Sequence, residues 1–273
     1  MKEELPQIVL FGDSLTQWGF VETTAGFGWV LEEKYAGKAK VVNEGQAGYT
    51  STLLENDFKR IIERATEPGA PPTLLLTIFL GANDACIIRS QEEYVPLPRF
   101  EANLREFVET VLIEDNMPET KIVLITPPPM NFPDYEEDDD EDLGPAAAAA
   151  AAAARQNPKE TRAYRTYLSK KRYGDKIMEI AQSYEETGRV AGLNYWKAMI
   201  DAGLDDQNRL GDEDAYDEER LPGCGLKWAK RFKKGYFTDG LHLGPLGYDV
   251  LSKGLLDLVL KKWPELEPES IKA

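Results

Sequence analysis

Short, uninterrupted apolar runs that alternate with helical patterns constrain the fold of this chain more than any other feature of its sequence. Four runs are clear and a fifth is weaker, and they cover residues 7–11, 40–43, 73–80, 121–126 and 189–194. Apolar residues that continue without alternation are typical of strands buried on both faces. The chain between the runs places apolar residues at helical spacing, as in residues 54–62 and 100–112. This order predicts a parallel sheet with helices on both sides.

We therefore predict an α/β fold: one three-layer α/β/α domain over residues 1–273, flavodoxin-like, with a five-stranded parallel sheet in the order 2-1-3-4-5. A final helix is expected from Pro245 to about Trp263. The acidic and alanine-rich stretch at about 135–158 interrupts the pattern. We expect it to be a surface insertion, because its acids repel one another and its alanines offer only methyl groups for packing. Whether it forms a lid stays open, and a second acidic stretch at 205–220 is expected to be an exposed loop.

The charge of the chain excludes some classes of partner. The sequence has 48 acidic and 32 basic residues, for a formal charge of −16, and a polyanionic surface repels nucleic acids and anionic lipids. No run reaches the roughly 18 apolar residues of a membrane span, and the first 14 residues lack the features of a signal peptide. Cys86 and Cys224 stand far apart, which favours a reducing compartment. We expect no nucleic-acid partner, no membrane insertion and a cytoplasmic location.

Polar, glycine-rich segments occur where such a fold places its chemistry, just beyond the carboxyl ends of the strands. They are FGDSLTQ at 11–17, NEGQAGYTS at 43–51, LGANDA at 80–85 and, before the last helix, DGLHLGP at 239–245. Each alone is compatible with an ordinary turn or helix cap. Their joint occurrence in this order indicates a catalytic site.

These segments resemble the SGNH, or GDSL, family of serine esterases and lipases, and the similarity extends from Phe11 to about Leu251. Two of them, IFLGANDAC and NEGQAGYTS, are most similar to the branch of isoamyl acetate-hydrolysing esterases. The resemblance implies hydrolysis of small carboxylic esters, such as short-chain acetates, through an acyl-serine intermediate. It implies a small-molecule ester as partner and no metal or cofactor. The oligomeric state stays open, a homodimer included.

The resemblance also assigns roles to individual residues. Ser14 matches the nucleophile, Asp239 and His242 match the rest of the triad, and the backbone of Ser14 and Gly48 with the side chain of Asn83 match the oxyanion hole. The chemistry agrees, because a serine hydroxyl needs a base to take its proton and histidine titrates near neutral pH. His242 is the only histidine in the chain. A carboxylate three residues earlier is close enough to hold its ring in one tautomer.

Some neighbouring residues have competing interpretations. Gly45 is the nearby rival of Gly48 for the oxyanion hole. Asp13 and Asp84 flank the expected catalytic positions, and we interpret them as structural carboxylates that bond loop N–H groups. The sequence lacks the G-x-S-x-G, P-loop and G-x-G-x-x-G motifs, and it has one histidine and no cysteine cluster. These absences argue against a nucleophile elbow, a nucleotide loop and a zinc site.

Four apolar residues on loops after the first and fourth runs are candidates for substrate binding: Trp18, Phe20, Met130 and Phe132. They either form an apolar wall beside Ser14 or belong to the core beneath the loops. A wall would suit a small hydrophobic acyl or alcohol group. The alternative substrates are acetylated carbohydrates or other larger acetylated molecules. The alternatives from other classes are a catalytically silent binding module of the same fold and a flavodoxin-like cofactor or signalling domain.

Overall fold

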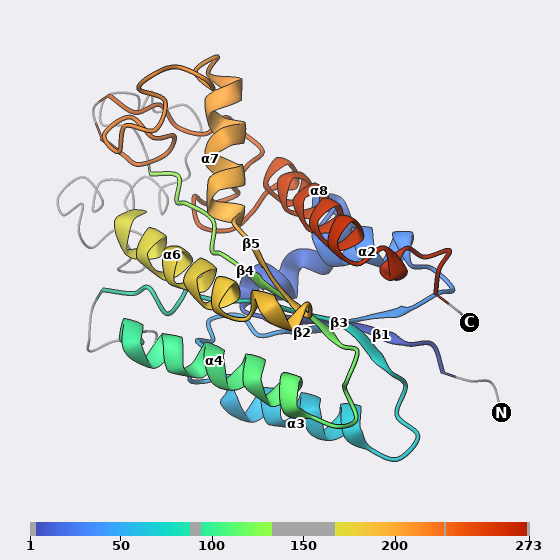
Figure 1. The fold of residues 1–273 in the computed structure, drawn as a ribbon. Coiled ribbons are helices and arrows are strands. Elements are labelled where there is room, and N and C mark those ends of the chain that lie inside the picture. Colours follow the sequence, from blue (N-terminus) through green and yellow to red (C-terminus); the bar gives the residue numbers. More distant parts are fainter. Residues whose placement is uncertain (1–3, 88–93, 133–166, 227, 272–273) are drawn as a thin grey trace, which may run out of the picture.

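The computed structural model describes residues 4–87, 94–132, 167–226 and 228–271. Its centre is a five-stranded parallel sheet in the order β2-β1-β3-β4-β5, which confirms the predicted architecture and strand order (Figure 1). The strands are β1 (Gln7–Gly12), β2 (Lys40–Gly45), β3 (Thr73–Phe79), β4 (Lys121–Ile125) and β5 (Val190–Leu193). Each lies within about two residues of the expected run, because strands buried on both faces leave a continuous apolar pattern in the sequence.

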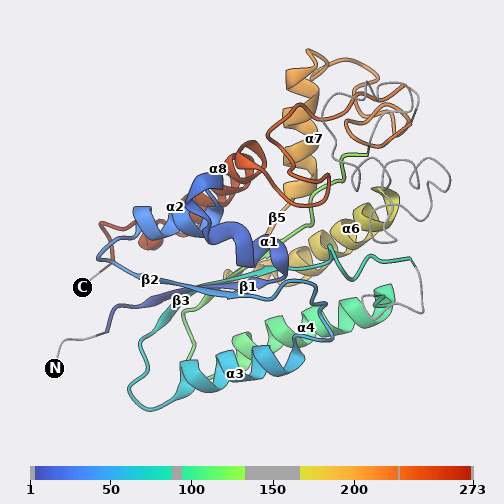
Figure 2. The ribbon, with the colours of Figure 1, turned by 180° about the vertical axis from the view of Figure 1, so that it is seen from behind.

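Helices cover both faces of the sheet and complete three layers. The α-helices are α1 (Ser14–Gln17), α2 (Phe27–Lys34), α3 (Glu55–Thr66), α4 (Leu97–Ile113), α6 (Tyr167–Ser183), α7 (Tyr195–Asp206) and α8 (Pro245–Lys262). The described residues also form four 3₁₀ turns: η1 (Trp18–Phe20), η2 (Glu22–Thr24), η3 (Glu185–Thr187) and η4 (Pro264–Leu266). Figure 2 shows α3, α4 and α6 on one side of the sheet and α2, α7 and α8 on the other.

Each face of the sheet has its own apolar core. Side chains alternate along a strand, so in β1 the side chains of Ile8 and Leu10 join the core under α2, α7 and α8. Those of Val9 and Phe11 join the core under α3, α4 and α6. The inner strands are therefore buried on both faces, and the polar, glycine-rich segments follow the carboxyl ends of the strands.

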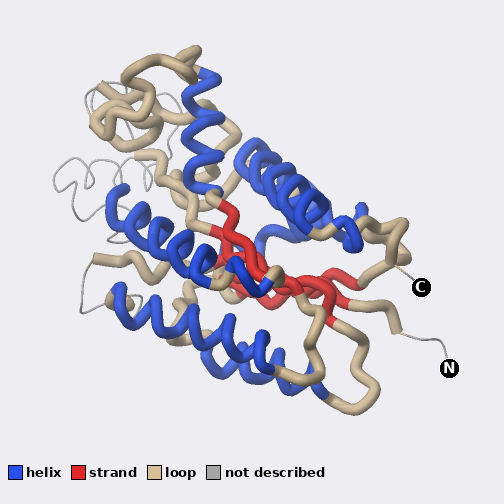
Figure 3. Tube along the Cα trace, in the orientation of Figure 1, coloured by secondary structure: helices blue, strands red, loops and turns tan. Residues whose placement is uncertain are grey.

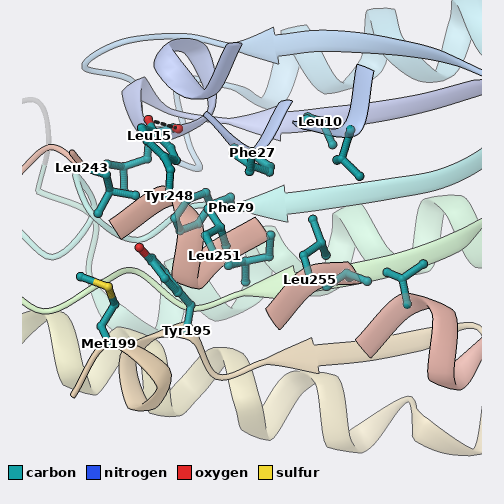
Figure 4. Close-up of a cluster of buried hydrophobic side chains, with 14 of the residues drawn as sticks. Leu10, Leu15, Phe27, Phe79, Tyr195, Met199, Leu243, Tyr248, Leu251 and Leu255 are labelled. Carbon is teal, nitrogen blue, oxygen red and sulfur yellow. Dashed lines mark hydrogen bonds between the residues drawn. The ribbon is translucent and has the colours of Figure 1, made fainter. Parts of the chain in front are cut away.

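The core beneath α8 ties the first strand-end segment to the last (Figure 4). The hydroxyl of Tyr248 in α8 donates to the carbonyl of Leu15 at 2.9 Å. The hydroxyl of Tyr195 in α7 donates to the carbonyl of Gly247 at 2.7 Å. Both phenols are buried, so these bonds form where water competes little. They fix the first turn of α8 against α1 and α7.

Beyond α7 the chain leaves the three layers as an irregular excursion before it enters α8 (Figure 3). Residues 207–226 and 228–244 form turns and loops, and most of the expected loop at 205–220, whose first two residues belong to α7, is exposed. The expected insertion at 135–158 lies outside the described residues. None of the described helices combines the length and apolar character needed to cross a membrane.

Candidate active site

Ser14 begins helix α1 directly after β1. Asp13 caps this helix: its side chain accepts a hydrogen bond from the backbone N–H of Leu15 at 2.9 Å, as predicted for a structural carboxylate. A Cβ at Gly12 would lie 2.4 Å from the carbonyl oxygen of Phe79, so only glycine lets β1 run this close to β3. The turn therefore holds Ser14 in one place, with 6% of its surface exposed.

The segment that carries Asp239 and His242 is a tight turn closed by an antiparallel bridge between Phe237 and Leu243. One carboxylate oxygen of Asp239 accepts the backbone N–H groups of Leu241 and His242, at 2.9 and 2.8 Å. Its other oxygen lies 2.6 Å from Nδ1 of the His242 ring. The turn thus fixes both the carboxylate and the ring.

The structure brings this turn to Ser14 across 228 residues of sequence. Oγ of Ser14 lies 3.2 Å from Nε2 of His242, so Ser14, His242 and Asp239 form a continuous hydrogen-bonded chain. Burial alone would raise the pKa of Asp239, but the bonds from the His242 ring and from the two backbone N–H groups outweigh it and hold that pKa well below its usual range. Asp239 therefore stays ionised beside the ring at neutral pH.

The loops after β2 and β3 also meet at this edge of the sheet. The amide of Asn83 donates to the carbonyl of Tyr49 at 2.8 Å, next to Gly48. The backbone N–H of Ala47 donates to the side chain of Gln17 at 2.7 Å. The expected oxyanion residues Gly48 and Asn83 thus belong to one assembly with the end of α1.

The two neighbouring glycines have different requirements. A Cβ at Gly45 would lie 2.2 Å from the backbone nitrogen of Gln17, so Gly45 serves the close packing of β2 on α1. Gly48 has open space around it but a φ of +81°, a conformation that glycine adopts without strain. The backbone conformation at position 48, rather than a lack of space for a side chain, requires glycine.

Asp84 lies beneath these loops and has no exposed surface. Its carboxylate accepts the backbone N–H groups of Ser51 at 2.8 Å and of Gly81 at 3.2 Å. Burial raises its pKa, although the bonds from Ser51 and Gly81 oppose that rise. Asp84 joins the loop after β2 to the loop after β3, which agrees with its predicted structural role.

The sequence analysis overlooked Asn103 in α4. It is fully buried, and its amide donates to the hydroxyls of Ser51 and Thr52 at 2.9 Å each. A signal was present, since Asn103 is a polar residue on the apolar stripe that Phe100 and Phe107 define. Asn103 extends the buried network from Asp84 into the helix layer.

The four candidates for an apolar wall lie in different surroundings. The ring of Trp18 packs against the ring of His242 with 4.3 Å between centroids, and Trp18 is 41% exposed. Phe20 is partly buried, packs on the core and covers Gly28 of α2. Phe132 is partly buried in the same core. Met130 has no exposed surface, so it fits the interpretation as a core residue beneath the loops better than the interpretation as part of an apolar wall.

Comparison with known proteins decides the family. A family model described as GDSL-like lipase/acylhydrolase matches residues 10–161, more than half of the chain. The chain belongs to this family. The match contains the first three strand-end segments, and the His242 turn lies beyond it. The resemblance inferred from the sequence is thereby confirmed.

Individual members of the family can be compared with the chain. An isoamyl acetate-hydrolyzing esterase 1 homolog of Mus musculus is 36% identical over 126 residues, which are 46% of this chain and 49% of the relative. The chain thus spans about half the length of the first mammalian relatives that it matches. The isoamyl acetate-hydrolyzing esterase of Saccharomyces cerevisiae is 24% identical over 97% of this chain and 90% of its own.

Solved structures share the fold. A catalytic mutant of Axe2, an acetylxylan esterase from Geobacillus stearothermophilus, superposes with a TM-score of 0.57 over 94% of this chain and 95% of its own. Its sequence identity is 17%, so the similarity concerns the three-layer architecture alone.

Proposed function

We propose that this member of the GDSL-like lipase/acylhydrolase family hydrolyses small carboxylic esters through an acyl-serine intermediate. The observation that carries the proposal is the hydrogen-bonded chain from Ser14 Oγ through the His242 ring to Asp239, with distances of 3.2 and 2.6 Å. A nucleophile, a base and a carboxylate that orients the base are the three parts that acyl transfer to serine requires.

Each step follows from this geometry. Ser14 Oγ attacks the ester carbonyl while Nε2 of His242 takes its proton. The ring then returns the proton to the departing alcohol, and the acyl group stays on Ser14. Water attacks this acyl-serine ester and gives a proton to the same nitrogen. As the bond between Ser14 Oγ and the acyl group breaks, the ring passes that proton to Ser14 Oγ, which releases the acid and restores the serine hydroxyl. Asp239 holds Nδ1–H throughout and stabilises the positive charge on the ring.

The negative charge that develops on the carbonyl oxygen needs fixed donors. We assign these donors to the backbone N–H groups of Ser14 and Gly48 and to the side-chain amide of Asn83. Support comes from the bond between Asn83 and Tyr49 O, which orients the amide plane beside Gly48. Donors fixed before the reaction cost no reorganisation when the charge forms.

The surroundings of the triad favour an apolar ester. Trp18 presents an exposed ring directly against His242, and a short-chain acetate of a hydrophobic alcohol would cover it. The names of the mouse and yeast relatives, isoamyl acetate-hydrolyzing esterases, point the same way. An acetylated carbohydrate is the alternative, because exposed aromatic rings such as Trp18 and Tyr49 also stack on sugars. We further propose that the chain forms one domain, since both cores lie on the same sheet.

The test compares hydrolysis of p-nitrophenyl acetate and isoamyl acetate by the wild-type protein and by Ser14→Ala. We expect Ser14→Ala to lose turnover by about a thousandfold or more, with circular dichroism showing an intact fold. Ser252→Ala is a matched control: Ser252 is also 6% exposed, but its hydroxyl bonds to the carbonyl of Tyr248 within α8. It should keep wild-type turnover. Equal turnover by Ser14→Ala and the wild type would refute the mechanism.

A further inference from the structure

The chain that follows β4 is a rigid, buried segment. Residues 126–131 are buried throughout, and the prolines at 127–129 restrict φ and carry no amide hydrogen. At its start, the backbone N–H of Thr126 donates to the carbonyl of Leu193 at 3.1 Å. The segment therefore delivers its last residue, Asn131, to a fixed position.

Asn131 makes hydrogen bonds at two points, one before the turn that carries Asp239 and His242 and one within that turn. Its side-chain oxygen accepts the backbone N–H of Phe232 at 3.0 Å, and its side-chain nitrogen donates to the carbonyl of the same residue at 3.5 Å. Its own backbone N–H donates to the carbonyl of Gly240 at 3.0 Å. Asn131 is 9% exposed and Phe232 is 4% exposed, so water competes little for these bonds.

The bond to Gly240 reaches the triad through one peptide unit. The carbonyl of Gly240 and the N–H of Leu241 belong to the same planar group. Asn131 holds the carbonyl end, and Asp239 accepts the N–H end at 2.9 Å. Because the group is planar, fixing its carbonyl also fixes the direction in which its N–H meets the carboxylate. The same oxygen of Asp239 accepts the N–H of His242, and the other oxygen holds the ring.

We propose that Asn131 is a positioning residue of the site: by clamping residues 232–240 it keeps Asp239, and through it His242, in the orientation that Ser14 requires. Asn131 acts through the peptide unit and contacts neither His242 nor Ser14 by any hydrogen bond among the described residues. The effect of Asn131 on turnover rests on the proposed ester hydrolysis. Its effect on the orientation of the His242 ring does not depend on that proposal.

Asn131→Ala removes both side-chain bonds to Phe232, whereas the backbone N–H at position 131 can still donate to Gly240. The variant therefore loosens the clamp at its Phe232 end and leaves the side chains of Ser14, Asp239 and His242 in place. Small displacements of catalytic groups reduce turnover steeply, so we expect kcat to fall about 10- to 100-fold with KM little changed. The matched control is Asn194→Ala. Asn194 also follows a strand of the sheet, and its side chain also accepts one backbone N–H, that of Lys197 at 2.9 Å, but it caps α7 and does not touch residues 232–242 in any bond among the described residues.

The second readout is the imidazole spectrum of His242 by nuclear magnetic resonance, which needs no assignment because the chain has one histidine. The proton that Nδ1 shares with Asp239 reports on that hydrogen bond. We expect its signal to shift or broaden in Asn131→Ala and to stay as in the wild type in Asn194→Ala. An unchanged signal together with wild-type kcat in Asn131→Ala would overturn the proposal. So would equal changes in both variants, since they would reflect general loss of stability.

A measurement on the wild-type protein covers the case in which Asn131→Ala does not fold. If the clamp holds, the backbone amide of Phe232 exchanges its hydrogen as slowly as amides of the core strands. Exchange as fast as in the exposed turns at 211–214 would overturn the proposal. The spectrum and the exchange rate require no substrate. A failure of the proposed ester hydrolysis in the Ser14→Ala test is therefore distinguishable from a failure of the clamp.

Discussion

The half of the site that carries Ser14 and Asn83 is buried, whereas the half that carries Asp239 and His242 stands at the surface. Ser14 and Asn83 are each 6% exposed. The side chains of Asp239 and His242 are 55% and 21% exposed. The first half rests on three neighbouring strands, and the second stands on the irregular chain between α7 and α8 (Figure 3). The two halves must therefore be held in place by different means.

Their carboxylates show the difference. Asp84 supports the buried half: burial raises its pKa, and the N–H groups of Ser51 and Gly81 only partly oppose this. Asp239 belongs to the exposed half, where the His242 ring and local N–H groups lower its pKa despite partial burial. In the buried half, the carboxylate of Asp84 fixes two loops although burial destabilises its charge. In the exposed half, short local hydrogen bonds hold Asp239 in place. Removing groups from the two halves should therefore give different ratios of lost activity to lost stability.

The largest expected effect comes from the exposed half. His242→Ala removes the proposed general base, and we expect turnover to fall by about 10⁴- to 10⁶-fold. The free energy of unfolding should change by less than about 1 kcal/mol, since the pair of Asp239 and His242 is partly solvated. Ester hydrolysis and urea unfolding of the same preparation measure both quantities. Wild-type turnover in this variant would end the proposed mechanism.

A smaller loss of activity with a larger loss of stability is expected in the buried half. Asn83→Ala removes one of the proposed donors for the developing oxyanion, and we expect this to cost about 10²- to 10³-fold in turnover. It also leaves the carbonyl of Tyr49 without the amide that now bonds to it, at a cost of about 1–3 kcal/mol. The same two measurements apply. A loss of stability no larger than that of His242→Ala would contradict the contrast between the halves.

The sequence predicted the sheet and the candidate site residues better than it predicted the contacts that support them. Strands buried on both faces leave continuous apolar runs, so the parallel sheet was predictable from the pattern, and the four strand-end segments pointed to the residues of the proposed triad. The supporting contacts were not predictable in this way. Asn131 and Phe232 lie 101 residues apart, and Asn103 and Ser51 lie 52 apart. Such pairs arise where segments cross in space, and neither residue shows its partner locally. The choice between wall and core for Met130 stayed open for a related reason, because burial within a loop has no period.

The smallest expected effect tests the two carboxylates directly through the pH dependence of stability. For Asp239 the folded-state pKa is lowered, so the ionised group stabilises the fold above its unfolded pKa of about 3.9. That contribution begins to be lost as the pH falls through this value, because the unfolded chain then binds the proton first, and the loss continues until the pH is below the lower folded-state pKa. For Asp84 the folded-state pKa is raised, so the sign is reversed. Protonation favours the fold, and the cost of its charge disappears as the pH falls.

Urea unfolding of wild type, Asp239→Asn and Asp84→Asn between about pH 3 and pH 7 measures both contributions. As the pH falls, the stability of the wild type relative to Asp239→Asn should decrease, whereas its stability relative to Asp84→Asn should increase. Each substitution has other consequences, such as an amide group that faces the Gly81 N–H in Asp84→Asn. These change the free energy of unfolding by the same amount at every pH and leave its dependence on pH unchanged. The Asp239 slope should be shallow, since water screens a half-exposed group. Two parallel slopes would show that both carboxylates share one environment and that the buried and exposed halves do not differ as described.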